Sequence, residues 1–286
     1  MKLGIGPYYF TRYPGKEGYE RMRSHGYDYL DFDHYANTEG GLYHEDEAEF
    51  IRITEELRDK FRDAGYTVWQ IHGPWRYPQD STEQDRAERF EKMSMALHAA
   101  SILGAKYMAI HPIMPFGWEG HTEKETEELW RINADFFSRL AAMGEKYGVT
   151  VCLENMPFPD FPISSAVDIT RLVKEVNHPF FKVCLDTGHA NVVKPAPAEA
   201  VHVIGKDYLK ILHVHGNNGK EDSHLNPGHP DDTTDWAAFT AALKEIDFDG
   251  VVNLETFPKP QNPDGKAPED IEINLATMAK KIAGNI

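Results

Sequence analysis

Short apolar runs alternate with longer amphipathic stretches along the whole chain. A run of roughly four to eight apolar residues that ends at a polar or glycine-containing turn is typical of a buried strand. Such runs occur at 3–10, 27–32, 67–72, 106–111, 149–154, 181–186, 208–215 and 250–255. The pattern therefore predicts eight strands.

Between these runs, apolar residues recur at helical spacing among charged ones. The predicted helices cover 17–24, 45–64, 81–103, 122–147, 165–176, 197–203, 235–246 and 268–283. Thr122 and Glu125 form a capping-box pattern, and Gly65 and Gly104 follow the ends of two helices, as is common at helix C-termini. The chain is thus expected to carry one helix after each strand.

Strict alternation of strands and helices implies parallel strands with helical crossovers. Eight such units in 286 residues match a (β/α)8 TIM barrel, which commonly needs about 250 residues. An open doubly wound sheet is the lesser alternative. We see no linker or low-complexity tract, so we expect residues 1–286 to form a single domain.

Composition narrows the function classes. The net charge of −16 and a pI near 5.3 disfavour a nucleic-acid partner or an anionic membrane surface. We find no signal-peptide pattern and no apolar run of the roughly 20 residues that a membrane span needs. Cys152 and Cys184 lie inside apolar runs, where buried reduced thiols are expected. These features together favour a cytoplasmic protein.

Polar side chains end six consecutive predicted strands. They are His72, His111, Glu154, Asp186, His215 and Glu255. In a (β/α)8 barrel the C-terminal strand ends meet at one rim, where catalytic groups lie. Residues i and i+2 share a face of a strand, so His213 should point the same way as His215. Any one of these residues alone could be a helix cap or a hydrogen-bonded filler, but six in succession favour a shared site.

Three carboxylates that face one another at such a rim would repel, and their pKa values would rise without a cation between them. A divalent metal ion resolves this conflict. Two glutamates, an aspartate and one imidazole form a hard, oxygen-rich ligand set that suits Mn²⁺, Mg²⁺ or Co²⁺, and Zn²⁺ if further histidines join.

Several segments carry a family pattern. They are Leu153-Glu154-Asn155, Leu185-Asp186-Thr187-Gly188-His189, His213-Val214-His215-Gly216-Asn217, His224-Leu225-Asn226-Pro227-Gly228 followed by Asp235-Trp236, and Leu254-Glu255. With them the chain resembles the xylose isomerase-like TIM-barrel superfamily, in particular its sugar phosphate isomerase/epimerase branch. The likeness covers nearly the whole chain. It is specific in strands five to eight and weak before residue 70.

The resemblance implies one divalent metal ion held by Glu154, Asp186, His215 and Glu255. It also implies a metal-dependent isomerase or epimerase that removes a proton beside a carbonyl group of a sugar or sugar phosphate. The two glutamates would act as acid and base, and the metal would stabilise the enediolate. Relatives of this kind are often dimers or tetramers, so a homo-oligomer is possible, and the sequence does not determine the oligomeric state.

Other residues have expected roles around this centre. His72, His111 and His189 would hold substrate hydroxyls, and Trp75, Trp118 and Phe257 would wall the pocket. Arg76 and Lys220 are the nearest basic residues for a substrate phosphate. Ketose 3-epimerases carry an Arg shortly after the metal-binding His, whereas this chain has Gly216-Asn217-Asn218-Gly219-Lys220. The substrate and the choice between isomerisation, epimerisation and dehydration therefore stay open.

Two alternatives share the fold. The first is an endonuclease IV-like multi-zinc phosphoester hydrolase, with Asp222 and His224 as additional metal ligands. Matching residue types are His72, His111, Glu154, Asp186, His189, His215, Asp222, His224 and Glu255. The acidic charge and the lack of a basic, aromatic-interleaved loop oppose it. The second is a non-catalytic sugar-binding barrel, which the paired glutamates disfavour.

Overall fold

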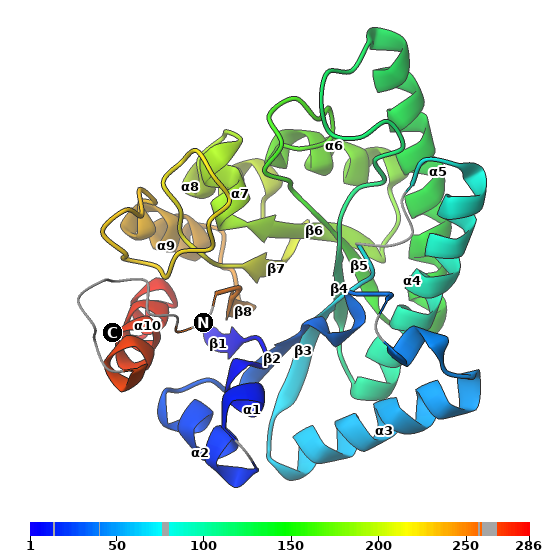
Figure 1. Cartoon of the computed structure of the whole chain (residues 1–286). Coiled ribbons are helices and arrows are strands. Elements are labelled where there is room, and N and C mark those ends of the chain that lie inside the picture. Colours follow the sequence, from blue (N-terminus) through cyan, green and yellow to red (C-terminus); the bar gives the residue numbers. More distant parts are fainter. Residues whose placement is uncertain (14, 40, 76–79, 257, 259–267) are drawn as a thin grey trace.

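The strands of this computed structural model form a barrel, and each of the eight predicted strand regions contributes one strand to it (Figure 1). The structure describes residues 1–13, 15–39, 41–75, 80–256, 258 and 268–286. The strands are β1 (Lys2–Ile5), β2 (Tyr29–Phe32), β3 (Thr67–His72), β4 (Tyr107–Ile110), β5 (Thr150–Glu154), β6 (Phe181–Asp186), β7 (Leu209–His213) and β8 (Val251–Leu254). All pair in parallel, in the order β7-β6-β5-β4-β3-β2-β1-β8. A parallel bridge between Val214 and Leu254 joins the two ends. The predicted (β/α)8 barrel is confirmed.

Helices surround the strands as an outer layer (Figure 1). They are α1 (Tyr8–Arg12), α2 (Lys16–Ser24), α3 (Glu47–Asp63), α4 (Glu83–Leu103), α5 (Glu123–Tyr147), α6 (Ala166–Val176), α7 (Thr187–Val192), α8 (Pro197–Ile204), α9 (Trp236–Glu245) and α10 (Pro268–Ile282), with 3-10 turns at Asp33–Tyr35 and Gly41–His44. Each predicted helix is present within a few residues. Thr122 and Glu125 form the predicted capping box of α5.

Three segments differ from the prediction, and one of them is the seventh strand, which ends at His213 and not at residue 215. The first strand ends at Ile5 and not at residue 10, because the chain turns at Pro7 and winds into α1, which buries Tyr9 in the core. Helix α7 was not predicted. It starts directly after β6, and the carboxylate of Asp186 caps it by accepting from the backbone N–H of His189. These local hydrogen bonds place His189 beside the strand ends.

The barrel interior changes from apolar to polar along its axis. A small buried cluster contains Ala109, Cys152, Cys184 and Ile211, and both cysteines are free thiols, as expected. Buried polar side chains of β2, β3 and β8 lie in the same interior, and the larger apolar core lies between strands and helices. No helix in the described ranges is long and apolar enough to cross a membrane.

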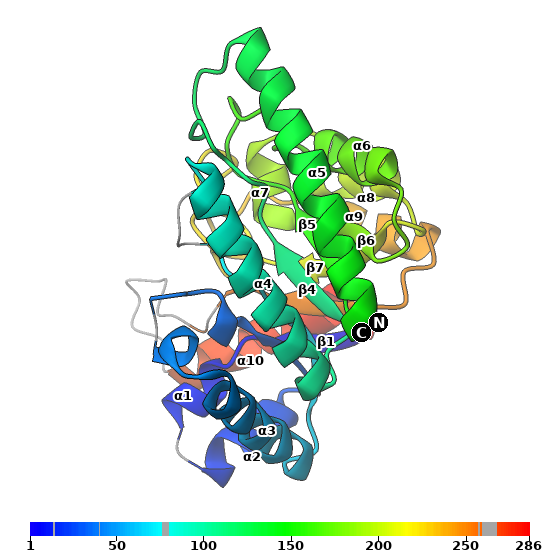
Figure 2. The same cartoon turned by 90° about the vertical axis from the view of Figure 1, so that its right-hand side faces the viewer.

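The two ends of the chain meet on the face of the barrel opposite the strand C-termini (Figure 2). The amino group of Met1 donates to the carbonyl oxygen of Ala283 at 3.0 Å. Nearby, the fully buried Glu272 of α10 accepts from Tyr13 at 2.6 Å and from Arg21 at 2.5 Å. This carboxylate ties the last helix to the first two.

Replacing Glu272 with Gln should lower the free energy of unfolding by about 2 kcal/mol, because the charge-assisted bond to Arg21 is lost in a buried place. The exposed Glu269 on the same helix is a matched control, and Glu269→Gln should change stability by less than about 0.5 kcal/mol. Urea unfolding followed by circular dichroism measures both. Equal stability of the two variants would contradict the assigned role of Glu272.

Candidate metal centre at the strand ends

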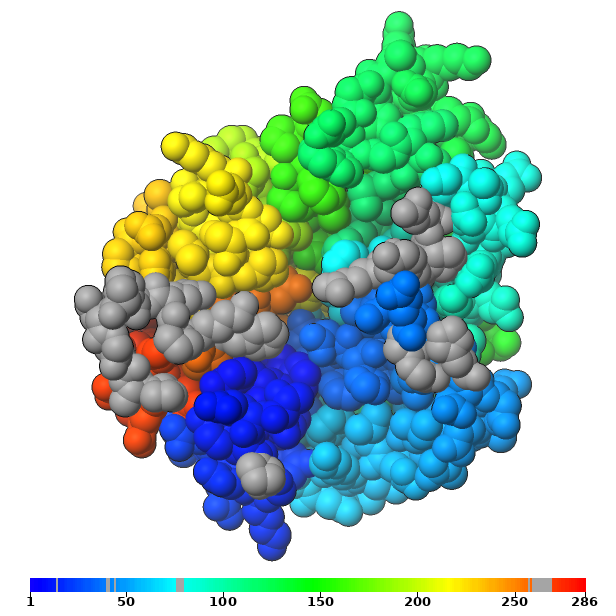
Figure 3. Space-filling view, viewed as in Figure 1, coloured from blue at the N-terminus to red at the C-terminus, as the bar shows by residue number. Residues whose placement is uncertain are grey.

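Most of the predicted site residues lie at the C-terminal ends of the strands or in the segments that follow them. His72, Glu154 and Asp186 are the last residues of β3, β5 and β6, whereas His111 and Glu255 directly follow β4 and β8. Figure 3 shows this face of the molecule, with loops from the first, middle and last thirds of the chain around its centre. Segments far apart in the sequence thus supply one site.

Three carboxylates and one imidazole form the central group, which contains Glu154, Asp186, His213 and Glu255. One ligand atom from each lies within 4.8 Å of the others. His213 Nδ1 is 2.8 Å from Glu154 Oε1 and 3.3 Å from Glu255 Oε2. The imidazole in this group is that of His213, whereas His215, the expected ligand, lies next to Asp186, and its role as a metal ligand stays a prediction.

The register of β7 explains the difference. His213 is the last residue of β7 and pairs with Asp186 of β6. His215 points to the same side, as predicted, but lies beyond the end of the strand. Its Nε2 is 3.0 Å from Asp186 Oδ2, and its ring stacks on His224 with centroids 3.8 Å apart. A Cβ atom at Gly188 would lie 2.0 Å from this ring, so the position leaves room only for glycine.

A second group contains His189, His215, Asp222 and His224, again with ligand atoms within 4.8 Å of one another. Asp222 Oδ2 is 3.2 Å from His189 Nε2 and 3.3 Å from His224 Nε2. Asp186 lies between the two groups because it contacts His215 through Oδ2 and caps α7 through Oδ1. The structure therefore brings Asp222 and His224 next to the central group.

His72 and His111 lie on the other side of Glu154. Their Nε2 atoms are 3.6 Å and 3.4 Å from Glu154 Oε2. Trp75 covers them, with its ring 5.2 Å from that of His111. Trp118 does not reach this part of the site as described, since it is 47% exposed and stacks on Phe158.

Three further predicted residues were assigned to the substrate pocket. Arg76 and Phe257 lie outside the described residues. Lys220 is exposed in the loop after β7, where its backbone N–H donates to the side chain of Asn218. A role for Lys220 in phosphate binding stays a prediction.

Burial and neighbouring charges shift several pKa values in opposite directions. Burial alone would raise the pKa of Asp186, but His189 and His215 lower it to about 2. Burial also opposes ionisation of Glu154, yet His213, His111 and His72 hold its pKa well below the usual range. Burial, Glu154 and Asp186 raise the pKa of Glu255. The imidazoles thus stabilise the negative charges of Glu154 and Asp186 more than that of Glu255.

The central group fits a divalent cation. Glu154 Oε2 and Glu255 Oε2 are buried oxygen atoms without a hydrogen-bond partner among the described residues. Buried, unpaired carboxylate oxygens are costly unless a cation or donor satisfies them. Three carboxylates with one imidazole also match the ligand preferences of Mn²⁺, Mg²⁺ and Co²⁺ and are compatible with Zn²⁺.

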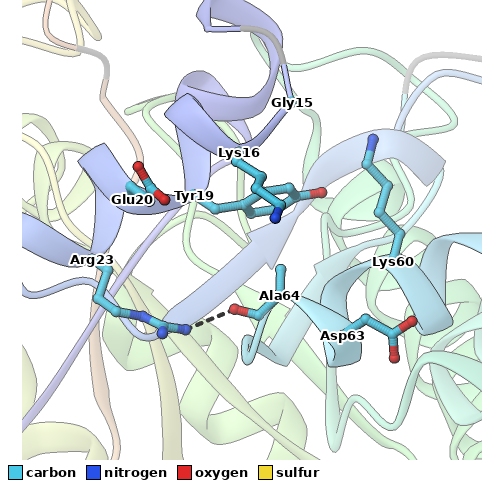
Figure 4. A pocket seen from close by; sticks show the side chains of 8 residues that line it. All are labelled: Gly15, Lys16, Tyr19, Glu20, Arg23, Lys60, Asp63 and Ala64. Carbon is cyan, nitrogen blue, oxygen red and sulfur yellow. Dashed lines mark hydrogen bonds between the residues drawn. The ribbon is translucent and has the colours of Figure 1, made fainter.

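A separate groove of about 470 Å³ lies outside the barrel between α2 and α3 (Figure 4). Lys16, Lys60 and Asp63 line it, and Arg23 donates to the carbonyl oxygen of Ala64 at 2.7 Å. None of its lining residues belongs to the strand-end groups.

Fold and site together define a (β/α)8 protein with a carboxylate–imidazole centre at the strand C-termini. Residues 19–278 match the model of the xylose isomerase-like TIM barrel family. The chain belongs to this family.

Individual relatives are distant. An uncharacterized protein of Methanocaldococcus jannaschii is 26% identical over 265 residues, 89% of this chain and 83% of that protein. D-psicose 3-epimerase of Ruminiclostridium cellulolyticum is 29% identical over 150 residues, 52% of this chain and 48% of the epimerase. The alignment thus spans about half the length of that enzyme. The solved structure of IolI protein, which has a bound zinc atom, superposes with a TM-score of 0.73 at 20% identity and covers 100% of this chain and 97% of that one.

Replacing Asp222 with Asn should lower the pKa of His224 and His189 in metal-free protein. Burial lowers the pKa of both imidazoles. Asp222 outweighs burial at His224 and raises its pKa to about 9. Asp186 and, after it, Asp222 outweigh burial at His189 and raise its pKa to about 10. His224 should therefore shift more, because His189 keeps Asp186. NMR titration of the imidazole protons measures both.

The same charges affect stability. A pKa raised by folding stabilises the folded state at low pH, and this contribution is lost as the pH rises through about 9 to 10. Metal-free Asp222→Asn should lose less stability than the wild type over that range, and the exposed Asp231→Asn in the same loop should behave as wild type. Unchanged imidazole pKa values in Asp222→Asn would contradict the assigned contacts.

Proposed function

We propose that this protein is a divalent-metal-dependent isomerase or epimerase of a sugar or sugar phosphate. The main support is the convergence of Glu154, Asp186, His213 and Glu255 at the strand ends, with two buried carboxylate oxygens that have no hydrogen-bond partner among the described residues. Membership of the family and the likeness to a D-psicose 3-epimerase support a sugar as the substrate.

The residues that would hold the metal are Glu154, Asp186, His215 and Glu255, and His213 lies close enough to Glu154 and Glu255 to serve as a further ligand. Mn²⁺, Mg²⁺ or Co²⁺ suits this set, and the zinc atom in the IolI structure supports Zn²⁺ as well. A bound divalent ion would polarise the carbonyl and hydroxyl oxygens of a sugar and stabilise negative charge that develops on them.

The chain's own groups would move the proton. Glu154 comes from β5 and Glu255 follows β8, so the two carboxylates approach a substrate from different sides of the barrel. One takes a proton from the carbon beside the carbonyl group, and the other returns a proton to the opposite face or to the neighbouring carbon. His72, His111 and His189 would hold hydroxyl groups, and Trp75 would exclude water on one side.

A multi-zinc phosphoester hydrolase is the second candidate, because His189, His215, Asp222 and His224 form another group with the spacing of metal ligands. The net charge of −16 opposes a DNA substrate. A sugar-binding barrel without catalysis would keep its ligand after metal removal, and this separates it from both enzymes.

Metal analysis is the first test. We expect the purified protein to bind one equivalent of Mn²⁺, Mg²⁺, Co²⁺ or Zn²⁺ with high occupancy, measured by plasma mass spectrometry and calorimetry. Glu255→Gln should weaken binding by about 10-fold or more, since a charged ligand is lost. The exposed Glu221→Gln, on the loop after β7, should bind as wild type. Three tightly bound zinc ions would favour the hydrolase, and the absence of any bound metal would refute the proposal.

Proton exchange is the second test. The metal-loaded protein is incubated in deuterated water with ketoses, aldoses, inososes and their phosphates, and exchange at carbon is followed by NMR. We expect exchange on at least one sugar, and a rate lower by about 100-fold or more in Glu154→Gln and Glu255→Gln. Wild-type exchange in Glu255→Gln would remove this residue from the mechanism, whereas Glu221→Gln should retain full activity.

A further inference from the structure

The loop after β7 opens with Gly216-Asn217-Asn218-Gly219-Lys220 and folds back on itself. Gly216 and Leu225 pair in antiparallel register, and each donates its N–H to the carbonyl oxygen of the other at 2.8 Å. The residues between them include Asp222, whose Oδ2 is 3.2 Å from Nε2 of His189 on α7. The position of this loop against α7 therefore decides whether Asp222 reaches His189.

Asn217 fastens the loop to α7. Its side chain is fully buried. The Nδ2 atom donates to the carbonyl oxygen of Gly188 at 2.7 Å, and the Oδ1 atom accepts from Nδ2 of Asn191 at 2.9 Å. Gly188 and Asn191 both belong to α7. One amide group thus holds the loop at two points of the helix.

The same amide also shapes the loop. Its Oδ1 accepts a second hydrogen bond from the backbone N–H of Gly219 at 2.9 Å, where the chain turns with a φ of +73° that glycine adopts without strain. The backbone oxygen of Asn217 accepts from the N–H of Thr233 at 2.9 Å, where the loop returns. An amide suits this place because it offers a donor and an acceptor, whereas an aspartate has no donor for Gly188.

We propose that Asn217 is a positioning residue that locks the loop after β7 to α7, so that Asp222 and His189 form a preformed side wall of the site. His189 is held from its other side, since its Nδ1 donates to the carbonyl oxygen of Asn155 at 2.7 Å. Side chains fixed in this way can bind a substrate without first being ordered. The inference rests on the proposed function, because it assigns this wall to the binding of the sugar.

NMR on the metal-free protein tests the position of the loop without an assay of activity. The ring protons of His189 should show nuclear Overhauser contacts with the β protons of Asp222 in the wild type. Asn217→Ala should lose these contacts while circular dichroism shows a folded protein. Asn191→Ala removes the partner on α7 and should weaken the same contacts.

Asn218→Ala is the matched control, because the side chain of Asn218 accepts from the backbone N–H groups of Lys220 and Glu221 within the same loop. This variant should keep the contacts between Asp222 and His189. Loss of these contacts in Asn218→Ala as well would contradict a specific role of Asn217.

Kinetics on a sugar that the wild type converts test the functional part. Asn217→Ala should raise KM by about 10-fold or more and change kcat by less than about 3-fold, since a binding wall is lost while Glu154 and Glu255 stay in place. A purely structural role would instead reduce the fraction of folded enzyme, which lowers the apparent kcat at unchanged KM. Asn218→Ala should keep the wild-type KM.

Retained contacts between Asp222 and His189, or a wild-type KM, in folded Asn217→Ala would overturn the role of Asn217 alone. If neither Asn217→Ala nor Asn191→Ala folds, the wild type decides. The side-chain amide protons of Asn217 should then exchange slowly with solvent, and rapid exchange would overturn the lock. A wild type that converts no sugar would overturn the proposed function and the assignment of the wall to the sugar, whereas the NMR contacts would still decide the position of the loop.

Discussion

Buried negative charge at the mouth of the barrel is the constraint on which the site depends. Glu154 and Asp186 are buried, and Glu255, which is partly exposed, has a ligand atom within 4.8 Å of theirs. Each uncompensated charge in such a place costs several kcal/mol. Imidazoles from β3, β7 and the loops after β4 and β6 surround these carboxylates, and a bound cation would neutralise them more completely. The same crowding that destabilises the centre therefore creates its affinity for metal.

The barrel architecture makes this crowding possible. The acids come from strands that are distant in sequence, and each reaches the rim because its strand ends at or just before that residue. Hydrogen bonds between neighbouring strands fix the position of each of these side chains along the barrel axis. His213 pairs in register with Asp186, whereas His215 lies past the strand and joins Asp222 and His224. The position of each histidine within or beyond β7 thus decides which imidazole faces which set of carboxylates.

Much of this arrangement could be predicted from the pattern of apolar runs. The limits of β3 and β6 match the predicted ones, because each run ends at a single polar residue, His72 or Asp186. His215 was the predicted ligand and His213 was expected to share its face, and strand pairing sets the positions of the two imidazoles.

The double role of Asp186 links the centre to the backbone of the next helix. Its Oδ1 accepts from the amide of His189 at 2.6 Å, and its Oδ2 faces His215. A cation bound to this carboxylate would draw electron density from it and so weaken the hydrogen bond that caps α7. The rate at which the His189 amide exchanges with solvent deuterium should therefore depend on whether a cation is bound at the strand ends. This rate can be measured without substrate.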